Sequence, residues 1–408
     1  MNILLINHYA GSPKMGMEFR PYYMAREWEK MGHKVLIVCA SYSHVRSKQF
    51  DITKDYTIKE SEGINYFIIK TPKYHGNNFG RVKNIYSFVR GLKKHSKKLS
   101  ETFKPDFVIA SSTYPSDIYS AHKISKLSKA KLIFEIHDLW PLSPMELGGY
   151  SKWHPFIMLM QHAENYAYKN CDKVVSILPK TKEHAVKHGL SPEKWYHIPN
   201  GIVVDKWNKE LEIPQEYSEI INKQIKKGHQ LIGYTGSHGV ANALDCIINA
   251  MEILKNHDIS LFLIGNGPAK NDLINLSKRL DLKNVFFLNS IDKELIPSIL
   301  DKIDILYIGL QNQPLFRFGI SPNKLIDYMM AGKPVIQAIK AGNDIVKEAE
   351  CGISTEPENP EKISEAIIKL TNLSEKEKLL LGNNGKNFVL KNHNYKILAK
   401  EFIDIICR

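Results

Sequence analysis

The chain has 408 residues, which is long for one hydrophobic core and favours two domains of about 200 residues each. Its composition is that of a folded globular protein without low-complexity tracts or solenoid repeats, so fibrous and disordered classes are excluded. No apolar run is long enough to cross a bilayer, and the first residues have the pattern of neither a signal peptide nor a membrane span.

The five cysteines are scattered, with no pair at metal-ligand spacing, which predicts a cytoplasmic protein without structural zinc.

The charge is concentrated in the first half: residues 1–200 contain 30 lysines and arginines against 17 acids, whereas residues 201–408 contain 26 of each. Residues 81–98 carry seven of the basic side chains and no acid, with apolar residues at helical spacing. This basic amphipathic helix is either a solvated face or a contact with anionic lipid head groups. No nucleic-acid partner is expected, because no recognised binding motif accompanies the charge.

The first half opens with the order expected of a doubly wound α/β domain. Residues 2–7 and 35–40 are apolar strands, and a loop at 8–18 and a helix at 19–31 separate them. Ligands of such sheets bind at the carboxyl ends of the strands, so the loop should line a site. The spacing of Gly11 and Gly16 begins a phosphate-binding P-loop, but Met17 and Glu18 stand where Lys and Ser/Thr are required. The loop is therefore either a flexible segment that lets backbone approach a ligand or a plain turn.

His137 follows a predicted strand at 132–136, which places it at the ligand-binding edge of the sheet. A lone histidine there is either a structural residue or a functional one. The turn Pro199-Asn200-Gly201 precedes the domain boundary. We expect a first Rossmann-like domain over 1–204, a second over 205–384, and a C-terminal helix within 385–408 that packs back on the first.

The α/β pattern starts again in the second half. A strand at 230–234 precedes the loop with Gly236 and Ser237, and a strand at 260–264 precedes the turn 265–268. Two consecutive α/β domains predict a deep cleft, a natural site for a bipartite ligand such as a nucleotide-sugar.

Residues 317–336 read as a loop, a short helix and a new strand. Pro322 suits the first helical turn, where free backbone N–H groups attract anions. Lys324 and Asp327 share one helix face, with a cation for phosphate and a carboxylate for sugar hydroxyls. Taken alone, Lys324 is better explained as a solvated helix lysine and Asp327 as an ordinary i,i+3 partner, and the surrounding motif favours the functional roles.

The segments GYTGS, LIGNGP, IPNG, IHDLWP and SPNKLIDYMMAGKPVI together resemble the retaining glycosyltransferases of family four, which have the GT-B architecture. NHYAGSPKMGMEFRPYYMAREWEKMGH and HDLWPLSPMELGG are similar to a narrower bacterial subgroup of the WbuB type, described as N-acetyl-L-fucosamine transferases.

The resemblance implies that the second domain holds a UDP-sugar and that the first contacts the acceptor. The family's Glu-x7-Glu pair falls on Gly319 and Asp327, so backbone N–H groups replace the first glutamate. The family's Arg and Lys after the first strand of the second domain are absent, and Lys324 and Arg317 are the nearby substitutes. The resemblance implies catalytic roles for His137 and Lys324, and donor contacts from Gly11, Ser12, Gly236, Ser237, Arg317, Gly319, Ile320, Ser321, Asn323 and Asp327.

The implied activity is retaining transfer of an N-acetyl-deoxyhexosamine, best assigned as N-acetyl-L-fucosamine, from a UDP-sugar. The acceptor would be an undecaprenyl-diphosphate-linked saccharide at the inner face of the cytoplasmic membrane, in O-antigen or capsule biosynthesis. No cofactor or metal is expected, because the sequence has no Asp-x-Asp. Two alternatives remain: a UDP-sugar 2-epimerase of the same architecture, and a nucleotide-sugar-binding protein without catalysis.

Overall fold

A computed structural model describes residues 1–16, 20–74, 76, 79–207 and 211–408. Met17, Glu18 and Phe19, which the sequence analysis placed in the first loop and helix, lie outside these residues. The chain forms two compact units. The first contains Met1–Asn200, Phe318–Ile320 and Tyr395–Arg408, and the second contains Gly201–Arg317 and Ser321–Asn394.

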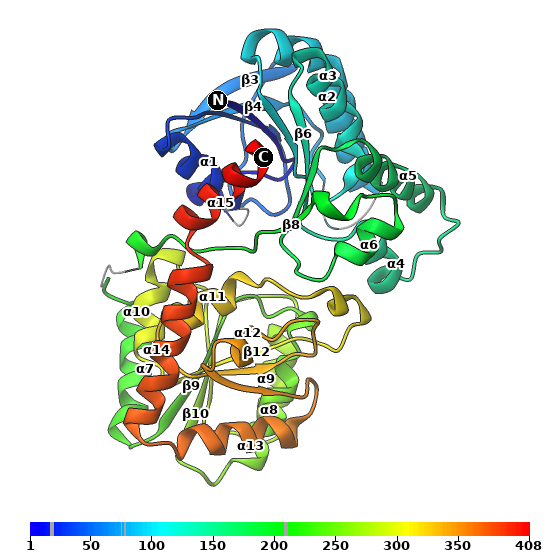
Figure 1. The fold of residues 1–408 in the computed structure, drawn as a ribbon. Helices are drawn as coiled ribbons and strands as arrows, with labels where there is room; N and C mark the ends of the chain where they lie inside the picture. The colour runs from blue at the N-terminus through cyan, green and yellow to red at the C-terminus, as the bar shows by residue number, and fades with distance from the viewer. Residues whose placement is uncertain (17–19, 75, 77–78, 208–210) are drawn as a thin grey trace. The chain divides into compact units, whose positions relative to one another are not determined.

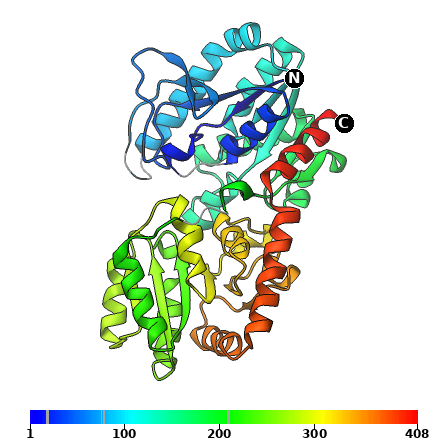
Figure 2. The ribbon, with the colours of Figure 1, turned by 90° about the vertical axis from the view of Figure 1, so that its left-hand side faces the viewer.

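The first unit is built on an eight-stranded sheet in the order β3-β4-β2-β1-β5-β6-β7-β8. All neighbouring strands are parallel except β3, which pairs with β4 as an antiparallel hairpin. The strands are β1 (Asn2–Ile6), β2 (Lys34–Ala40), β3 (Tyr56–Ser61), β4 (Ile64–Ile69), β5 (Phe107–Ala110), β6 (Lys131–Ile136), β7 (Lys173–Ser176) and β8 (Trp195–His197). The central strands are short apolar runs because helices cover both faces of the sheet (Figures 1 and 2).

The helices of the first unit are α1 (Arg20–Lys30), α2 (Phe79–Phe103), α3 (Ile118–Ser128), α4 (Leu142–Gly148), α5 (Pro155–Asn170), α6 (Lys182–Lys187) and α15 (Tyr395–Cys407). The predicted basic amphipathic helix is part of α2, which extends beyond it at both ends. Ile85, Phe88 and Leu92 are buried, whereas Tyr86 is exposed. No helix of the described residues is both long enough and apolar enough to span a membrane.

The second unit is built on a six-stranded, fully parallel sheet in the order β11-β10-β9-β12-β13-β14. Its strands are β9 (Gln230–Thr235), β10 (Ile259–Ile264), β11 (Val285–Leu288), β12 (Ile305–Gly309), β13 (Val335–Ala338) and β14 (Gly352–Thr355). Its helices are α7 (Gln215–Lys226), α8 (Leu244–Ile253), α9 (Lys270–Arg279), α10 (Ile296–Asp301), α11 (Asn323–Met330), α12 (Ile345–Glu348), α13 (Pro360–Thr371) and α14 (Glu375–Asn392). The first of these helices, α7, lies within the polar stretch 205–228.

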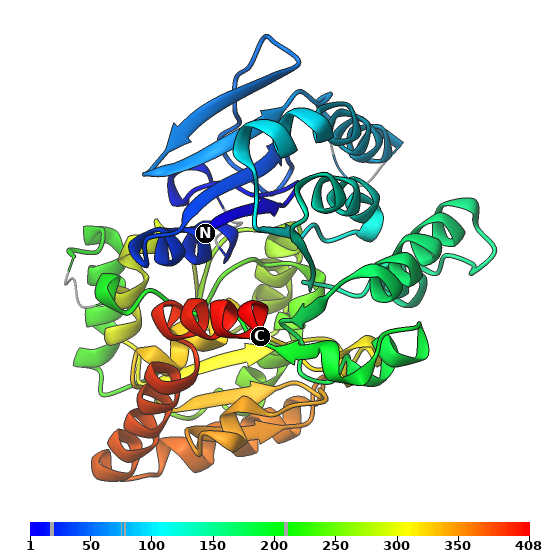
Figure 3. The same ribbon diagram turned by 45° about the horizontal axis from the view of Figure 1, so that its top comes forward.

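The prediction of one final helix over 385–406 is wrong, because two helices share this region. A complete capping box at Ser374 and Glu377 starts α14 well before residue 385. It ends at Asn392, and α15 begins at Tyr395. Figures 1 and 3 show α15 beside α1, and the Trp28 indole N–H donates to the Ala399 carbonyl over 3.0 Å.

Candidate active site

The second unit positions Lys324 at the start of α11. Its amino group donates hydrogen bonds to the Tyr234 hydroxyl and to Asn242 Oδ1, the latter over 3.2 Å. It also lies 4.0 Å from the centre of the Tyr234 ring. Burial lowers the pKa of Lys324 to about 7. The structure therefore holds a half-buried amino group that titrates near neutrality.

The loop after β9 makes room for this amino group. A Cβ on Gly236 would lie 2.9 Å from Lys324 Cε, so a side chain there would push the lysine aside. The next residue, Ser237, is exposed, and its carbonyl accepts from the Tyr234 hydroxyl and from the Asn242 amide. The structure thus brings together Gly236, Ser237 and Lys324, as the sequence analysis expected of a single site.

The start of α11 leaves backbone donors without a side-chain cap. Pro322 is the N-cap rather than a residue of the first turn, and it cannot supply a capping oxygen. Asn323, the first helical residue, is exposed. Backbone N–H groups at the uncapped start of α11, together with the Lys324 amino group, form an arrangement that binds phosphate.

Asp327 lies one turn further along α11 and does not pair with Lys324. Its carboxylate makes no side-chain hydrogen bond to any residue in the described part of the chain. Burial raises the pKa of Asp327, and the positive charge of Lys293 opposes this rise. The alternative of an i,i+3 pair with Lys324 is therefore not what the described residues show, and the carboxylate is available to accept hydrogen bonds.

Gly319 has a backbone φ of 94°, in the left-handed region that favours glycine. It stands between Phe318 and Ile320 in the segment that belongs to the first unit, where Lys180 N–H donates to the Phe318 carbonyl over 2.9 Å. Arg317 and Ser321 belong to the second unit, and the Arg317 guanidinium bonds the Pro314 carbonyl over 2.7 Å. The local backbone gives a physical reason for glycine where the family has glutamate.

In the first unit, His137 follows β6 directly and belongs to a polar network. Its Nε2 lies 3.0 Å from Glu135 Oε2 and 2.9 Å from Ser111 Oγ. Ser111 also donates to Glu135 Oε2 over 2.6 Å. Because the ionised carboxylate can only accept, the network assigns the ring proton to Nε2. Nδ1 is then the acceptor atom of this imidazole, and it bonds no residue in the described ranges.

Arg20 and Glu135 form a buried ion pair that the sequence analysis missed. Arg20 Nη2 lies 2.9 Å from Glu135 Oε1, and both side chains are almost completely buried. Burial would raise the pKa of Glu135, but the charge of Arg20 and the hydrogen bonds from His137 and Ser111 hold it well below its usual range. The sequence does contain a sign of this ion pair, because a glutamate inside the apolar run KLIFEI requires a buried partner.

Gly11 and Ser12 follow β1 and are both buried. The Ser12 hydroxyl lies 3.1 Å from that of Ser61, and the Gly11 carbonyl accepts from the Tyr66 hydroxyl over 3.0 Å. A Cβ on Gly11 would meet Arg46 Cδ at 2.8 Å. This part of the predicted loop is packed rather than open, and the recorded hydrogen bonds of His137 go to Ser111 and Glu135 instead.

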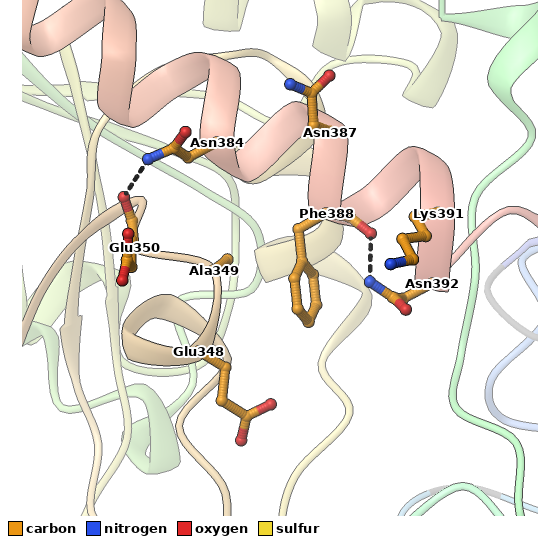
Figure 4. A pocket seen from close by; sticks show the side chains of 8 residues that line it. All are labelled: Glu348, Ala349, Glu350, Asn384, Asn387, Phe388, Lys391 and Asn392. Atoms are coloured by element: carbon orange, nitrogen blue, oxygen red, sulfur yellow. Dashed lines mark hydrogen bonds between the residues drawn. The ribbon is translucent and has the colours of Figure 1, made fainter.

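An open pocket of the second unit lies between α12 and α14 (Figure 4). Its lining includes Glu350, Asn384 and Phe388, and the Asn384 amide donates to the Glu350 carbonyl over 3.1 Å. None of the predicted site residues lines it. The pocket is therefore separate from the group around Lys324.

Comparison with known families agrees with this geometry. The Glycosyltransferase Family 4 model matches residues 15–206, and the model of Glycosyl transferases group 1 matches residues 217–388. The chain belongs to the family-4 glycosyltransferases, and the protein is a glycosyltransferase of the GT-B type. The predicted pair of Rossmann-like α/β domains is confirmed.

Among curated proteins, the chain is 20% identical over 315 residues to a probable glycosyltransferase, WbjE, of Pseudomonas aeruginosa, covering 75% of this chain and 76% of that protein. It is 22% identical over 261 residues to a putative colanic acid biosynthesis glycosyl transferase, WcaI, of Escherichia coli, covering 60% of this chain and 61% of that protein.

Among solved structures, Anabaena Alr3699/HepE in complex with UDP and glucose matches 100% of this chain and 99% of its own, with a TM-score of 0.68 and 14% identity. WaaG, a glycosyltransferase involved in lipopolysaccharide biosynthesis, matches 99% of both chains, with a TM-score of 0.67 and 17% identity. At these identities the likeness concerns the fold.

Proposed function

We propose that the protein transfers an N-acetyl-deoxyhexosamine, with N-acetyl-L-fucosamine as the best assignment, from a UDP-sugar to a lipid-linked saccharide with retention of configuration. The observation that carries this proposal is the Lys324 amino group beside the uncapped start of α11 in a family-4 chain. The structural similarity to a protein solved with UDP and glucose supports a UDP-sugar as donor. The similarity to a putative colanic acid biosynthesis enzyme supports a role in polysaccharide synthesis.

The proposed chemistry concentrates on the leaving group. Negative charge grows on UDP as the glycosidic bond breaks, and Lys324 with the N–H groups of α11 would stabilise it without a metal. Asp327 would accept hydrogen bonds from the ribose hydroxyls, and the backbone of the 319–321 segment would contact the sugar. No carboxylate nucleophile is assigned, and the departing phosphate would take the acceptor proton during attack on the same face.

His137 would bind a hydroxyl group of the UDP-sugar rather than move a proton. The Glu135 carboxylate holds Nε2 as the donor atom, so Nδ1 would accept a hydrogen bond from the sugar. Arg20 keeps Glu135 ionised and thereby fixes the tautomer of His137. Arg20 and Glu135 are positioning residues in this proposal.

The acceptor side of the proposal concerns the membrane. Helix α2 presents exposed basic side chains, and apolar side chains are also exposed at its start and near α5. Phe79 is 81% exposed and Trp153 is 71% exposed. Basic and aromatic side chains together favour an anionic lipid surface, where an undecaprenyl-diphosphate-linked acceptor resides. We therefore propose a peripheral location at the inner face of the cytoplasmic membrane.

A donor screen tests the function. Purified protein is incubated with candidate UDP-sugars, with and without an undecaprenyl-diphosphate-linked saccharide, and UDP release and glycolipid product are measured. We expect UDP release that requires the acceptor and is fastest with UDP-N-acetyl-L-fucosamine. Transfer from a different sugar would reject the donor assignment, and absence of transfer from every donor would reject the activity. NMR of acceptor-free reactions would reveal an epimerase through a changed UDP-sugar, whereas binding without turnover would indicate a non-catalytic protein.

A further inference from the structure

Glu164 of α5, His184 of α6 and His188, the C-cap of α6, meet in the first unit. One ligand atom from each of Glu164, His184 and His188 lies within 4.8 Å of the other two. Cysteine pairs and Asp-x-Asp were the two metal-binding patterns considered in the sequence, and this group belongs to neither. The histidines are four residues apart, so a helical turn brings both rings to one face.

The surrounding hydrogen bonds already orient the ligand atoms. The His188 Nδ1 lies 2.8 Å from the His184 carbonyl, so it is the donor atom and Nε2 keeps its lone pair. The Gln161 amide donates to Glu164 Oε2 over 2.8 Å, and the Tyr168 hydroxyl donates to Oε1 over 3.0 Å. Outer partners of this kind fix the tautomer and the direction of metal ligands.

The burial of the Glu164 carboxylate favours the binding of a positive ion. The Glu164 side chain is 2% exposed and the His184 side chain is 10% exposed, with 2.8 Å between Oε1 and Nε2. A buried carboxylate requires a positive partner, which a metal ion provides. Both histidines are only partly buried, so an ion can reach the group from solvent.

We propose that Glu164, His184 and His188 bind one divalent transition-metal ion, and that Zn²⁺ fits this ligand set best. Two imidazoles and a carboxylate are ligands that Zn²⁺ prefers, whereas Ca²⁺ and Mg²⁺ require oxygen ligands. Tetrahedral zinc ligands lie about 3.4 Å apart, because each is about 2.1 Å from the ion. The three ligand atoms lie within 4.8 Å of one another, so a bound ion would draw them closer together and leave the fourth position to a water molecule.

The ion would join α5 to α6 and hold the neighbouring segment Phe318–Ile320 of the first unit in place. The His184 ring packs edge-on against Phe318, with ring centres 5.6 Å apart. The site is structural, because its ligands are separate from Lys324 and His137. It does not depend on the proposed sugar transfer.

Calorimetric titration of EDTA-treated, desalted protein with ZnCl₂ tests the site. We expect one tight site per chain, a higher Tm with zinc, and a tetrahedral visible spectrum with Co²⁺. His188→Ala and Glu164→Gln should each weaken zinc binding by about tenfold or more, the usual effect of disturbing a zinc site.

His162→Ala is the matched control, because His162 lies exposed on α5 outside the group. It should leave zinc affinity unchanged. Circular dichroism establishes whether each variant is folded. If one of the two ligand variants does not fold, the other still tests the site. Absence of stoichiometric binding by the wild type overturns the proposal, as does wild-type affinity in folded His188→Ala or Glu164→Gln.

Discussion

Lys324 carries its positive charge without a carboxylate partner among the described residues, since its amino group bonds only a phenol and an amide. A diphosphate would supply the missing negative charge. We predict that Lys324→Ala lowers the rate of UDP release in the presence of acceptor by about two orders of magnitude, the effect of losing one donor to a developing oxyanion. Lys347→Ala, which removes an exposed lysine on α12, should retain full activity. Activity of Lys324→Ala within a few-fold of wild type would refute the assigned role.

The lowered pKa of Lys324 also predicts a proton uptake. At pH 8 the lysine of the free protein is mostly neutral, because burial lowers its pKa to about 7. A bound diphosphate favours the charged form and raises this pKa, so UDP binding at pH 8 should take up a proton from the buffer. Consequently, UDP affinity should fall as the pH rises above 7.

Calorimetry of UDP binding in two buffers of different ionisation enthalpy measures this uptake. Lys324→Met serves as the comparison, because it removes the titrating group and should abolish the dependence on buffer. Equal binding enthalpies in both buffers for the wild type at pH 8 would contradict the prediction.

The positive φ of Gly319 makes this position intolerant of side chains. Gly319→Ala should lower the free energy of unfolding by about 1–2 kcal/mol, the strain of a side chain in left-handed backbone. Urea denaturation measures the loss. Gly239→Ala is a suitable control, because its φ is −92° and an added Cβ would meet no atom closer than 3.5 Å. Equal losses in the two variants would reject the backbone explanation.

At the scale of elements, α2 combines a buried apolar face with exposed basic side chains. Arg90, Lys93 and Lys97 are exposed, and each basic residue near an anionic membrane contributes about 1 kcal/mol. Reversing all three to Glu should weaken binding to vesicles containing phosphatidylglycerol by at least about a hundredfold. Sedimentation with these vesicles measures the effect.

The matched control reverses three exposed lysines of the second unit, which are Lys369, Lys376 and Lys391. It changes the net charge equally and should bind vesicles as the wild type does. Equal weakening in both triple variants would show that net charge, rather than α2, determines the interaction.

The elements that sequence reasoning found are those with a strong periodic pattern. The apolar strands β1, β2, β6, β9 and β10 and the amphipathic α2 lie where it expected them. The β3–β4 hairpin was missed, since Lys59 and Glu60 are exposed at the sheet edge and interrupt the apolar pattern. Likewise, apolar residues continue beyond Asn392, so the sequence pattern did not reveal the break between α14 and α15.

The candidate site was predictable only in part. The position of His137 at a strand end and of Lys324 at a helix start follow from local sequence. The partners Tyr234 and Asn242 are more than 80 residues from Lys324 in the chain, so no local pattern connects them. The burial of Ser12 likewise depends on Ser61, which comes from the hairpin that was missed.

At the scale of the whole molecule, α15 completes the core of the first unit. Phe402 is fully buried, and its ring centre lies 5.2 Å from that of Trp28. Phe402→Ala should lower the free energy of unfolding by about 3–5 kcal/mol, as expected for a cavity of this size. Urea denaturation followed by tryptophan fluorescence measures the change. Ile397→Ala, on an exposed position of the same helix, should change it by less than about 0.5 kcal/mol.

The contribution of α15 to the first unit has a consequence for synthesis on the ribosome. Trp28 emerges before the second unit, whereas the carbonyl of Ala399 and the ring of Phe402 that cover it emerge after the second unit. Domains usually fold in the order of their synthesis, yet the first unit lacks this helix until the second has been translated. During this interval the surface that receives α15 is exposed, and a nascent chain stalled before residue 395 would be a natural substrate for chaperones.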